Sequence, residues 1–215
     1  MDLHLFYMTQ LIFLPGASGS TQFWYPLIET LTSEYNDNYK IIAYPGFGSA
    51  PVDRDLNSFE ELSQLVVEQI DQPCILIAQS MGGIFAVVAA LEKPHLVQGL
   101  VLIATSGGID LTKFDVADWR KSYLQEFLNY PDWFITTKVN YEERLAEIKQ
   151  QVLLIWGDHD PISPVAIGEY LQTKLTDARL KIIQGGQHDL ANKHAIQVSS
   201  LILEYFQSIK SELEC

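Results

Sequence analysis

The chain has 215 residues, 47% hydrophobic and 19% charged, which allows one domain with a sizeable core and argues against wholesale disorder. Its formal net charge is −13, from 14 Lys and Arg against 27 Asp and Glu. That balance disfavours nucleic acid and anionic membranes as partners, because both attract basic surfaces.

The N-terminal segment has apolar runs but no basic region, and a Pro-Gly pair ends it early, so it is a poor signal peptide. No apolar run approaches the length of a transmembrane helix. Met8 would make a sensible start of its own, with residues 1–7 as a loose extension. Cys74 and Cys215 form neither a disulfide framework nor a metal-type spacing, which indicates a reducing compartment. We therefore expect a cytoplasmic protein.

Six short apolar runs are predicted as β-strands. Most are continuously apolar, as expected for strands that are buried on both faces of a parallel sheet. Helical patterns lie between them, and one begins with Ser58 followed by Glu61, a capping-box pattern. The expected strands cover residues 11–14, 40–44, 74–78, 99–104, 151–156 and 179–184, and the expected helices cover residues 23–31, 58–70, 81–91, 164–175 and 191–210.

This alternation predicts an α/β fold, with an open, mostly parallel sheet of about six strands and helices on both faces. Residues 1–215 would form a single domain. Four strands run directly into turn residues, with the sequences PGASGS, PGFGS, QSMGG and GDHDP. Because ligands bind at the carboxyl ends of the strands in such sheets, we expect the functional site among these turns.

Residues 106–149 interrupt the alternation of strands and helices, because they contain no good strand and are dense in aromatic side chains. We expect a small, mostly helical insertion that rests on the carboxyl edge of the sheet as a lid. Some of its aromatic residues would then line a pocket, and Trp119 and Trp133 are the candidates. The plainer alternative is that these aromatics only pack within the insertion.

Ser80 lies in LIAQSMGG, where a predicted strand must reverse sharply into a helix. Such a turn holds its central residue in a strained backbone conformation and needs small residues on both sides. Gly82 and Gly83 follow Ser80, and Ala78 stands where a G-x-S-x-G motif has its first glycine. Ser80 is therefore a candidate nucleophile; the alternative is a serine that only caps the helix.

A catalytic serine needs a base and a group that orients that base. Among the five histidines, His188 lies in a glycine-containing loop directly after a predicted strand. Asp160 is far enough past its own strand to reach a neighbouring loop, and we prefer it to Asp158 as the acid. Asp189 is too close to His188 in sequence to face the imidazole. Because each follows a different strand, Ser80, Asp160 and His188 are predicted to form a catalytic triad.

An acyl-transfer site also needs hydrogen-bond donors for the oxyanion that develops. The backbone N–H of Met81, directly after the nucleophile, would be one donor. The other would be the N–H of Ala17, in the loop after the first strand, where Ser18 is a candidate substrate contact. This loop has neither G-x-G-x-x-G spacing nor a following Gly-Lys-Ser/Thr, which argues against nucleotide binding.

Together these segments resemble the α/β-hydrolase superfamily, over essentially the whole chain from Gln10 to Gln207. The resemblance rests on LPGASGSTQFWYPLIETL, IIAYPGFGSAP, AQSMGG, WGDHDPISP and GGQHD. Within the superfamily, the chain is most similar to the small esterases and C–C hydrolases that include pimeloyl-ACP methyl ester esterases and MenH of the menaquinone pathway. Pro15 replaces a histidine that often braces the oxyanion loop, Ala78 replaces a glycine, the lid is short and the usual N-terminal antiparallel hairpin is absent.

The resemblance implies a serine hydrolase that cleaves a small carboxylic ester or thioester through an acyl-enzyme on Ser80. It implies no metal and no organic cofactor, and a small-molecule substrate rather than nucleic acid or a membrane. Two alternatives stay open. One is a lyase or C–C bond hydrolase that uses the same triad for proton transfer, as in MenH, and the other is a non-catalytic, ligand-binding member of the fold.

Overall fold

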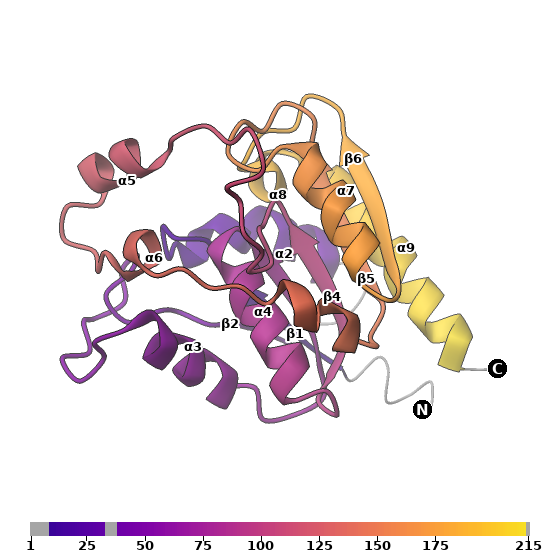
Figure 1. Ribbon diagram of the computed structural model, residues 1–215. Coiled ribbons are helices and arrows are strands. Elements are labelled where there is room, and N and C mark those ends of the chain that lie inside the picture. Colours follow the sequence, from indigo (N-terminus) through magenta and orange to yellow (C-terminus); the bar gives the residue numbers. More distant parts are fainter. Residues whose placement is uncertain (1–8, 33–37, 214–215) are drawn as a thin grey trace.

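The structure is a computed structural model that describes residues 9–32 and 38–213 (Figure 1). The predictions made for the extension before Met8 and for Cys215 lie outside these residues. The strands are β1 (Gln10–Leu14), β2 (Tyr39–Ile41), β3 (Cys74–Gln79), β4 (Val97–Ile103), β5 (Val152–Gly157) and β6 (Ala178–Ile183). The helices are η1 (Thr21–Trp24), α2 (Tyr25–Thr32), α3 (Phe59–Glu68), α4 (Met81–Glu92), α5 (Arg120–Glu126), α6 (Trp133–Thr136), η2 (Glu142–Glu147), α7 (Val165–Lys174), α8 (Leu190–Lys193) and α9 (Ala195–Leu213).

The described strands form one sheet in the order β2-β1-β3-β4-β5-β6, and every neighbouring pair is parallel. This confirms the predicted open α/β sheet. The chain runs from β1 outward to β2 and then returns to the other side of β1 as β3, so the strand order reverses beside β1. Such a reversal is where ligands bind in open α/β sheets. Because Leu14 pairs with Ala78, the turns that follow β1 and β3 begin side by side.

Helices cover both faces of the sheet, as predicted. The helices α3, α4 and α7 pack on one face, and α2, α8 and α9 on the other (Figure 1). Alternate residues of a strand point to opposite faces, so in β3 Leu76 and Ala78 belong to one core while Ile75 and Ile77 belong to the other. Burial on both faces explains the continuous apolar sequence that identified the strands.

The helix starts and ends follow local chemistry. Ser58 Oγ accepts a hydrogen bond from the Glu61 N–H at 3.1 Å at the start of α3, while the Glu61 carboxylate accepts from Asn57 rather than from Ser58. The predicted last helix is interrupted at His194, which ends α8 before α9 begins. Among the described helices, none combines the length and the apolar character that a membrane span requires.

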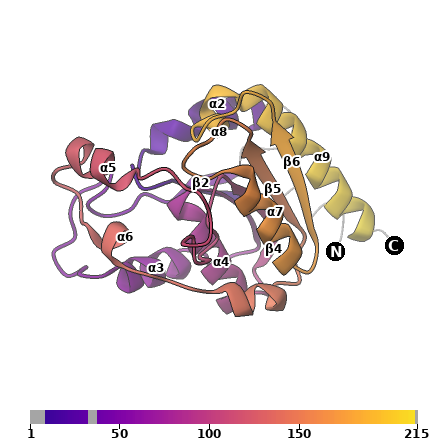
Figure 2. The ribbon, with the colours of Figure 1, turned by 45° about the horizontal axis from the view of Figure 1, so that its top comes forward.

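Residues 106–149 connect β4 to β5 and contain α5, α6 and η2, joined by irregular stretches. They are less helical than predicted. Figures 1 and 2 show α5 and α6 on the left, away from the C-terminal end of α9. The Ala117 N–H donates to the Pro161 carbonyl at 2.8 Å, and the Tyr130 hydroxyl donates to the Gly48 carbonyl at 3.4 Å. The insertion therefore contacts loops at the edge where the strands end.

Candidate active site

Ser80 lies at the turn between β3 and α4, with φ 52° and ψ −119°. A positive φ is unfavourable for a residue with a Cβ atom, so neighbouring groups must hold the turn. The Ser80 N–H donates to the Ile103 carbonyl at 3.1 Å, and the Thr105 hydroxyl donates to the Ser80 carbonyl at 2.6 Å. The Ser80 side chain makes no capping bond to α4, so the structure does not support the capping alternative.

Small residues allow a close approach around this turn. A Cβ atom on Gly82 would collide with the carbonyl oxygens of Leu14 and Pro15. The missing side chain therefore brings the start of α4 directly against the loop that follows β1. Ala78 is fully buried beside Leu14, so the fold accommodates a methyl group where the G-x-S-x-G motif has glycine.

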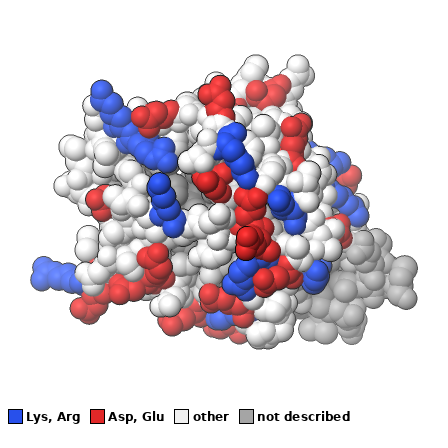
Figure 3. Space-filling model, in the orientation of Figure 1, with Lys and Arg blue, Asp and Glu red and all other residues white. Residues whose placement is uncertain are grey.

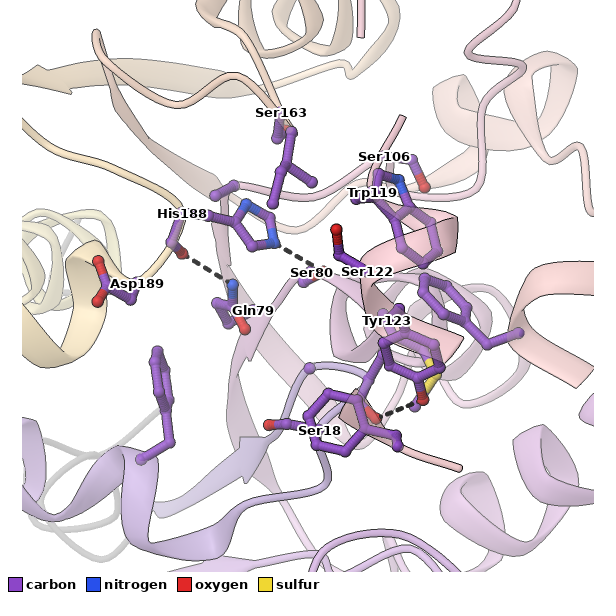
Figure 4. A pocket seen from close by; sticks show the side chains of 18 of the residues that line it. Ser18, Gln79, Ser80, Ser106, Trp119, Ser122, Tyr123, Ser163, His188 and Asp189 are labelled. Atoms are coloured by element: carbon purple, nitrogen blue, oxygen red, sulfur yellow. Dashed lines mark hydrogen bonds between the residues drawn. The ribbon is translucent and has the colours of Figure 1, made fainter. Parts of the chain in front are cut away.

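His188 connects Ser80 to Asp160 through its two ring nitrogens. Its Nε2 lies 3.1 Å from Ser80 Oγ, and its Nδ1 lies 2.8 Å from Asp160 Oδ2. An ionised carboxylate can only accept a hydrogen bond, so Nδ1 donates to it and Nε2 is left to accept from the serine hydroxyl. Figure 4 shows the imidazole pointing at Ser80 across the floor of a pocket. The turns after β3, β5 and β6 thus bring the three predicted residues together.

The Asp160 carboxylate is held in one orientation. Its side chain is wholly buried, and its Oδ1 accepts hydrogen bonds from the N–H groups of Ile162 at 2.8 Å and Ser163 at 3.0 Å. Because Oδ1 is occupied by the backbone, Oδ2 is presented to His188. A buried carboxylate with this set of donors can orient and support an imidazolium without rearranging.

The other acids and histidines that the sequence offered lie elsewhere. Asp158 Oδ1 accepts from the Gly185 N–H at 2.6 Å, so this exposed residue supports the loop that carries His188 rather than the imidazole itself. Asp189 is exposed and directly precedes α8. His4 lies outside the described residues. The other histidines of the described chain are absent from the lining of the pocket at Ser80: His95, His159 and His194.

Gln79 is a site residue that the sequence analysis did not single out. It is 5% exposed, and its Nε2 donates to the His188 carbonyl at 3.0 Å (Figure 4). A Cβ atom on Gly16 would lie 2.5 Å from Gln79 Oε1, so the loop after β1 packs on the same amide. One side chain thus contacts both loops beside Ser80. Its only signal in the sequence is a polar residue at the end of an apolar strand.

Two tyrosines hold the loop that contains Ala17. The Tyr44 hydroxyl donates to the Pro15 carbonyl and the Tyr123 hydroxyl to the Ala17 carbonyl, each at 2.9 Å. Burial raises the pKa of both phenols, so they stay protonated and keep donating. Met81 is the first residue of α4, where backbone N–H groups have no partner within the helix. Ala17 and Met81 line the same pocket, and the two tyrosine hydroxyls fix the loop from Pro15 to Ala17.

The pocket beside Ser80 has a volume of about 570 Å³. Ser18 and Trp119, two of the predicted substrate contacts, are in its lining. In Figure 4, Trp119 and Tyr123 from the insertion face His188 and Gln79 from the sheet edge. The rest of the aromatic lining consists of Phe23, Phe127 and Phe134.

Trp133, the third predicted substrate contact, lies elsewhere. It is absent from the pocket lining, and its ring centroid is 6.4 Å from that of Phe47. The next residue, Phe134, lines the pocket instead and stacks on Trp119 with 5.2 Å between the ring centroids. The insertion therefore contributes aromatics both to the pocket and to its own packing.

Ser80 has no competing thiol nearby in the described chain. Cys74 begins β3 and is fully buried, and burial raises the pKa of its thiol to about 12. It therefore stays protonated and is a poor nucleophile. Over the described ranges, no group of three or more His, Cys, Asp or Glu side chains is arranged to hold a metal ion.

An open parallel sheet with a strained serine in the turn after one strand, hydrogen-bonded through a histidine to a buried aspartate, is typical of the α/β-hydrolase fold. A family model described as "Alpha/beta hydrolase family" matches residues 11–147, and one described as "TAP-like protein" matches residues 116–213. The first match spans more than half of the chain. The protein belongs to the alpha/beta hydrolase family.

Curated relatives are similar at low identity. The pimeloyl-[acyl-carrier protein] methyl ester esterase of Neisseria meningitidis serogroup A is 24% identical over 78% of this chain and 68% of its own length. The 2-hydroxy-6-oxononadienedioate/2-hydroxy-6-oxononatrienedioate hydrolase of Escherichia coli K12 is 25% identical over 89% of this chain and 83% of its own length. These relatives confirm the resemblance to esterases and C–C hydrolases.

Solved structures support the fold. A lipase-esterase related protein from Clostridium acetobutylicum superposes with a TM-score of 0.75 at 20% identity, covering 91% of this chain and 93% of its own. A thermophilic esterase from Thermogutta terrifontis gives a TM-score of 0.74 at 16% identity, covering 94% of this chain and 90% of its own.

Proposed function

We propose that this protein is a serine hydrolase that cleaves a small carboxylic ester or thioester through an acyl-enzyme on Ser80. The observation that carries the proposal is the hydrogen-bonded series Ser80, His188, Asp160, in which Ser80 and His188 line a pocket and Asp160 is buried behind them. The Neisseria relative, named as a methyl ester esterase, supports this reaction class. The reaction uses no metal or organic cofactor, and we place the protein in the cytoplasm.

Acylation begins when the Ser80 hydroxyl attacks the carbonyl carbon of the substrate and its proton passes to His188 Nε2. Asp160 accepts the Nδ1 hydrogen bond throughout and stabilises the imidazolium that forms. The carbonyl oxygen becomes an oxyanion, held by the N–H groups of Ala17 and Met81. When the tetrahedral intermediate collapses, the leaving alcohol or thiol takes the proton from Nε2.

Deacylation repeats the same steps with water. His188 Nε2 removes a proton from water as its oxygen attacks the acyl carbon, and the same two N–H groups hold the second oxyanion. Collapse returns the proton to Ser80 Oγ and releases the carboxylic acid. Residues 106–149 act as a lid over this chemistry within the single domain, because Trp119, Tyr123 and Phe134 form a wall of the pocket.

The test combines covalent labelling with turnover. A fluorophosphonate probe should add its mass to Ser80, and p-nitrophenyl acetate and butyrate should be hydrolysed. The Ser80→Ala variant should lose both properties while keeping its far-UV circular dichroism. Wild-type protein that is neither labelled nor active on these esters would refute the proposal and leave either the second candidate described below or a non-catalytic, ligand-binding member of the fold.

A second candidate is cleavage of a C–C bond, or a lyase step, in which His188 and Ser80 only transfer protons. The Escherichia coli relative favours it, because it matches 89% of this chain and its name describes a dicarboxylate with a 2-hydroxy-6-oxo group. The second candidate predicts cleavage of a 2-hydroxy-6-oxo dienoate without ester turnover. Ester turnover that depends on Ser80, with no cleavage of the dienoate, would reject it.

A further inference from the structure

The charge of the pocket defines a substrate class. Resting on the function proposed above, we propose that the pocket admits esters and thioesters that are uncharged near the scissile bond and rejects those that carry a carboxylate or phosphate there. Glu126, at the C-terminal end of α5, is the residue that rejects the anions.

No lysine or arginine lines the pocket within the described chain. Apart from His188 and the Tyr123 phenol, its ionisable lining residues are two carboxylic acids, Glu126 and Asp189. The remaining polar lining is neutral and consists mostly of serine hydroxyls, from Ser18, Ser106, Ser122 and Ser163. On the surface seen in Figure 3, by contrast, Lys and Arg side chains are scattered among the acidic ones. The pocket thus offers donors for neutral oxygens but no cation for an anion.

Glu126 stands where a long substrate would have to pass. It lines the pocket and also an adjoining groove of about 390 Å³, and Ser18 and Phe127 line both as well. The other residues that line the groove are uncharged and are of the types Ser, Thr, Gln, Gly and Tyr. An acyl or alcohol group that reaches from Ser80 into the groove therefore passes the Glu126 carboxylate.

The basic residues that the structure describes in the same helix do not pair with Glu126. Arg120 and Lys121 belong to α5 but are absent from the lining of both the pocket and the groove. The Arg120 guanidinium lies 5.2 Å from the ring centroid of Trp119. Within the described part of the chain, no basic side chain forms an ion pair with Glu126.

An anionic substrate would meet two unfavourable effects. Its carboxylate would lose hydration against the aromatic wall, without a partner charge in return. It would also be repelled by Glu126, by Asp189 and by the buried Asp160 carboxylate behind His188, and like charges brought together in a binding site lower affinity strongly. A neutral acyl chain meets neither effect, and Ile84, Leu111 and Phe134 give it apolar contacts.

The experiment compares two esters that differ only in charge: mono-p-nitrophenyl glutarate, with a free carboxylate, and its methyl ester, p-nitrophenyl methyl glutarate. Release of p-nitrophenol reports both, after subtraction of the release measured with the Ser80→Ala variant, because the free carboxylate of the glutarate ester also attacks its own acyl group and expels p-nitrophenol as a cyclic anhydride forms. We expect kcat/KM to be at least about tenfold higher for the neutral ester at low salt. The ratio should narrow in 0.5 M NaCl, because Glu126 is exposed and its repulsion is screened.

Variants then test the assigned residue. Glu126→Gln should raise the anionic-to-neutral ratio of kcat/KM at least about threefold, and Glu126→Lys should raise it further. The matched controls are Glu68→Gln and Glu68→Lys, which make the same charge changes on the exposed surface of α3, outside the pocket lining. These controls should leave the ratio at the wild-type value.

Two kinds of failure are distinguishable. Equal or better turnover of the anionic ester by wild type, or the same ratio in Glu126→Gln and Glu68→Gln, would overturn the charge selectivity and leave the hydrolase intact. If Ser80 is labelled but both esters are inert, a pair of fluorophosphonates with carboxylate and methyl ester tails replaces them, and their labelling rates decide. Absence of any labelling and any turnover refutes the hydrolase function itself.

Discussion

The two walls of the pocket are built differently. One wall consists of Ser80, His188 and the loop that contains Ala17, which follow the parallel strands β3, β6 and β1 of one sheet, and Asp160, after β5, is buried behind His188. The other consists of side chains from α5 and α6, two short helices in an insertion whose surface is largely exposed. Register and burial fix the first wall, whereas a few hydrogen bonds and aromatic contacts hold the second. Substitutions at the sheet edge should therefore change the rate of the chemistry, and substitutions in the insertion should change which substrate is accepted.

The largest effect should come from the acid on the sheet side. Asp160→Asn should lower kcat about 10³–10⁴-fold, because an amide can no longer hold the protonated Nδ1 tautomer of His188. Asp158→Asn is the matched control and should cost less than about tenfold, since that residue only supports the loop. Turnover of p-nitrophenyl butyrate measures both. The reverse order of the two variants would reject Asp160 as the acid.

Substitution of Gln79 should lower kcat less, because this side chain holds the loop of His188 and takes no part in the reaction. Gln79→Leu leaves the His188 carbonyl without its donor, and a buried hydrogen bond lost in this way corresponds to about tenfold in kcat. Because the amide positions His188, kcat should fall while KM stays near its wild-type value. Gln64→Leu, on the exposed side of α3, is the control. A change in KM alone would indicate that Gln79 binds substrate instead.

Removing the hydrogen bond between the two walls should lower kcat less still. Tyr123→Phe removes the hydroxyl that donates to the Ala17 carbonyl and should lower kcat about threefold to tenfold, as expected for one neutral hydrogen bond. Tyr130→Phe removes a longer, 3.4 Å bond to Gly48 and should have almost no effect on kcat. If both variants are equally slow, the hydroxyl of Tyr123 has no special role at the oxyanion loop.

The smallest effect concerns how the insertion is anchored. Hydrogen bonds from Lys113 and Tyr170 lower the pKa of Glu142 to about 2, from an ordinary value of 4.5. A lowered folded-state pKa stabilises the fold above the ordinary value, and this contribution is lost as pH falls through the folded value. Glu142→Gln should therefore lower Tm slightly at pH 6, with the difference from wild type shrinking as pH falls from about 4.5 towards 2. Glu143→Gln is the control. An equal loss of Tm in both variants would show that the hydrogen bonds of Glu142 do not anchor the insertion.

The sheet side could be predicted from sequence because it depends on local patterns. Continuous apolar runs identify strands that are covered on both faces, and turn residues mark where those strands end. In a parallel sheet the carboxyl ends of neighbouring strands meet at one edge, so Ser80, Asp160 and His188 could be expected together without knowing any contact. The structure brings these residues within hydrogen-bonding distance, and their catalytic roles stay predictions.

The remaining features depend on contacts that the sequence does not encode locally. Tyr44 reaches Pro15 only because β2 lies beside β1, and the strand itself ends at Ile41, sooner than its apolar run suggested. In the insertion, α6 is a single turn of helix, too short for a periodicity that separates an inner from an outer face. No sequence pattern therefore distinguishes Trp133 from Phe134 as the residue that lines the pocket.

The bond from Tyr123 to the Ala17 carbonyl makes the two walls thermodynamically dependent on each other. If the Ala17 N–H holds the oxyanion as proposed, the docked position of α5 and the donor geometry of that peptide favour one another. Linkage is reciprocal. If docking of α5 strengthens the binding of a negatively charged oxygen at Ser80 by some factor, binding of that oxygen strengthens the docking of α5 by the same factor. A tetrahedral adduct on Ser80 should therefore slow amide hydrogen exchange in α5, a helix that the adduct need not touch.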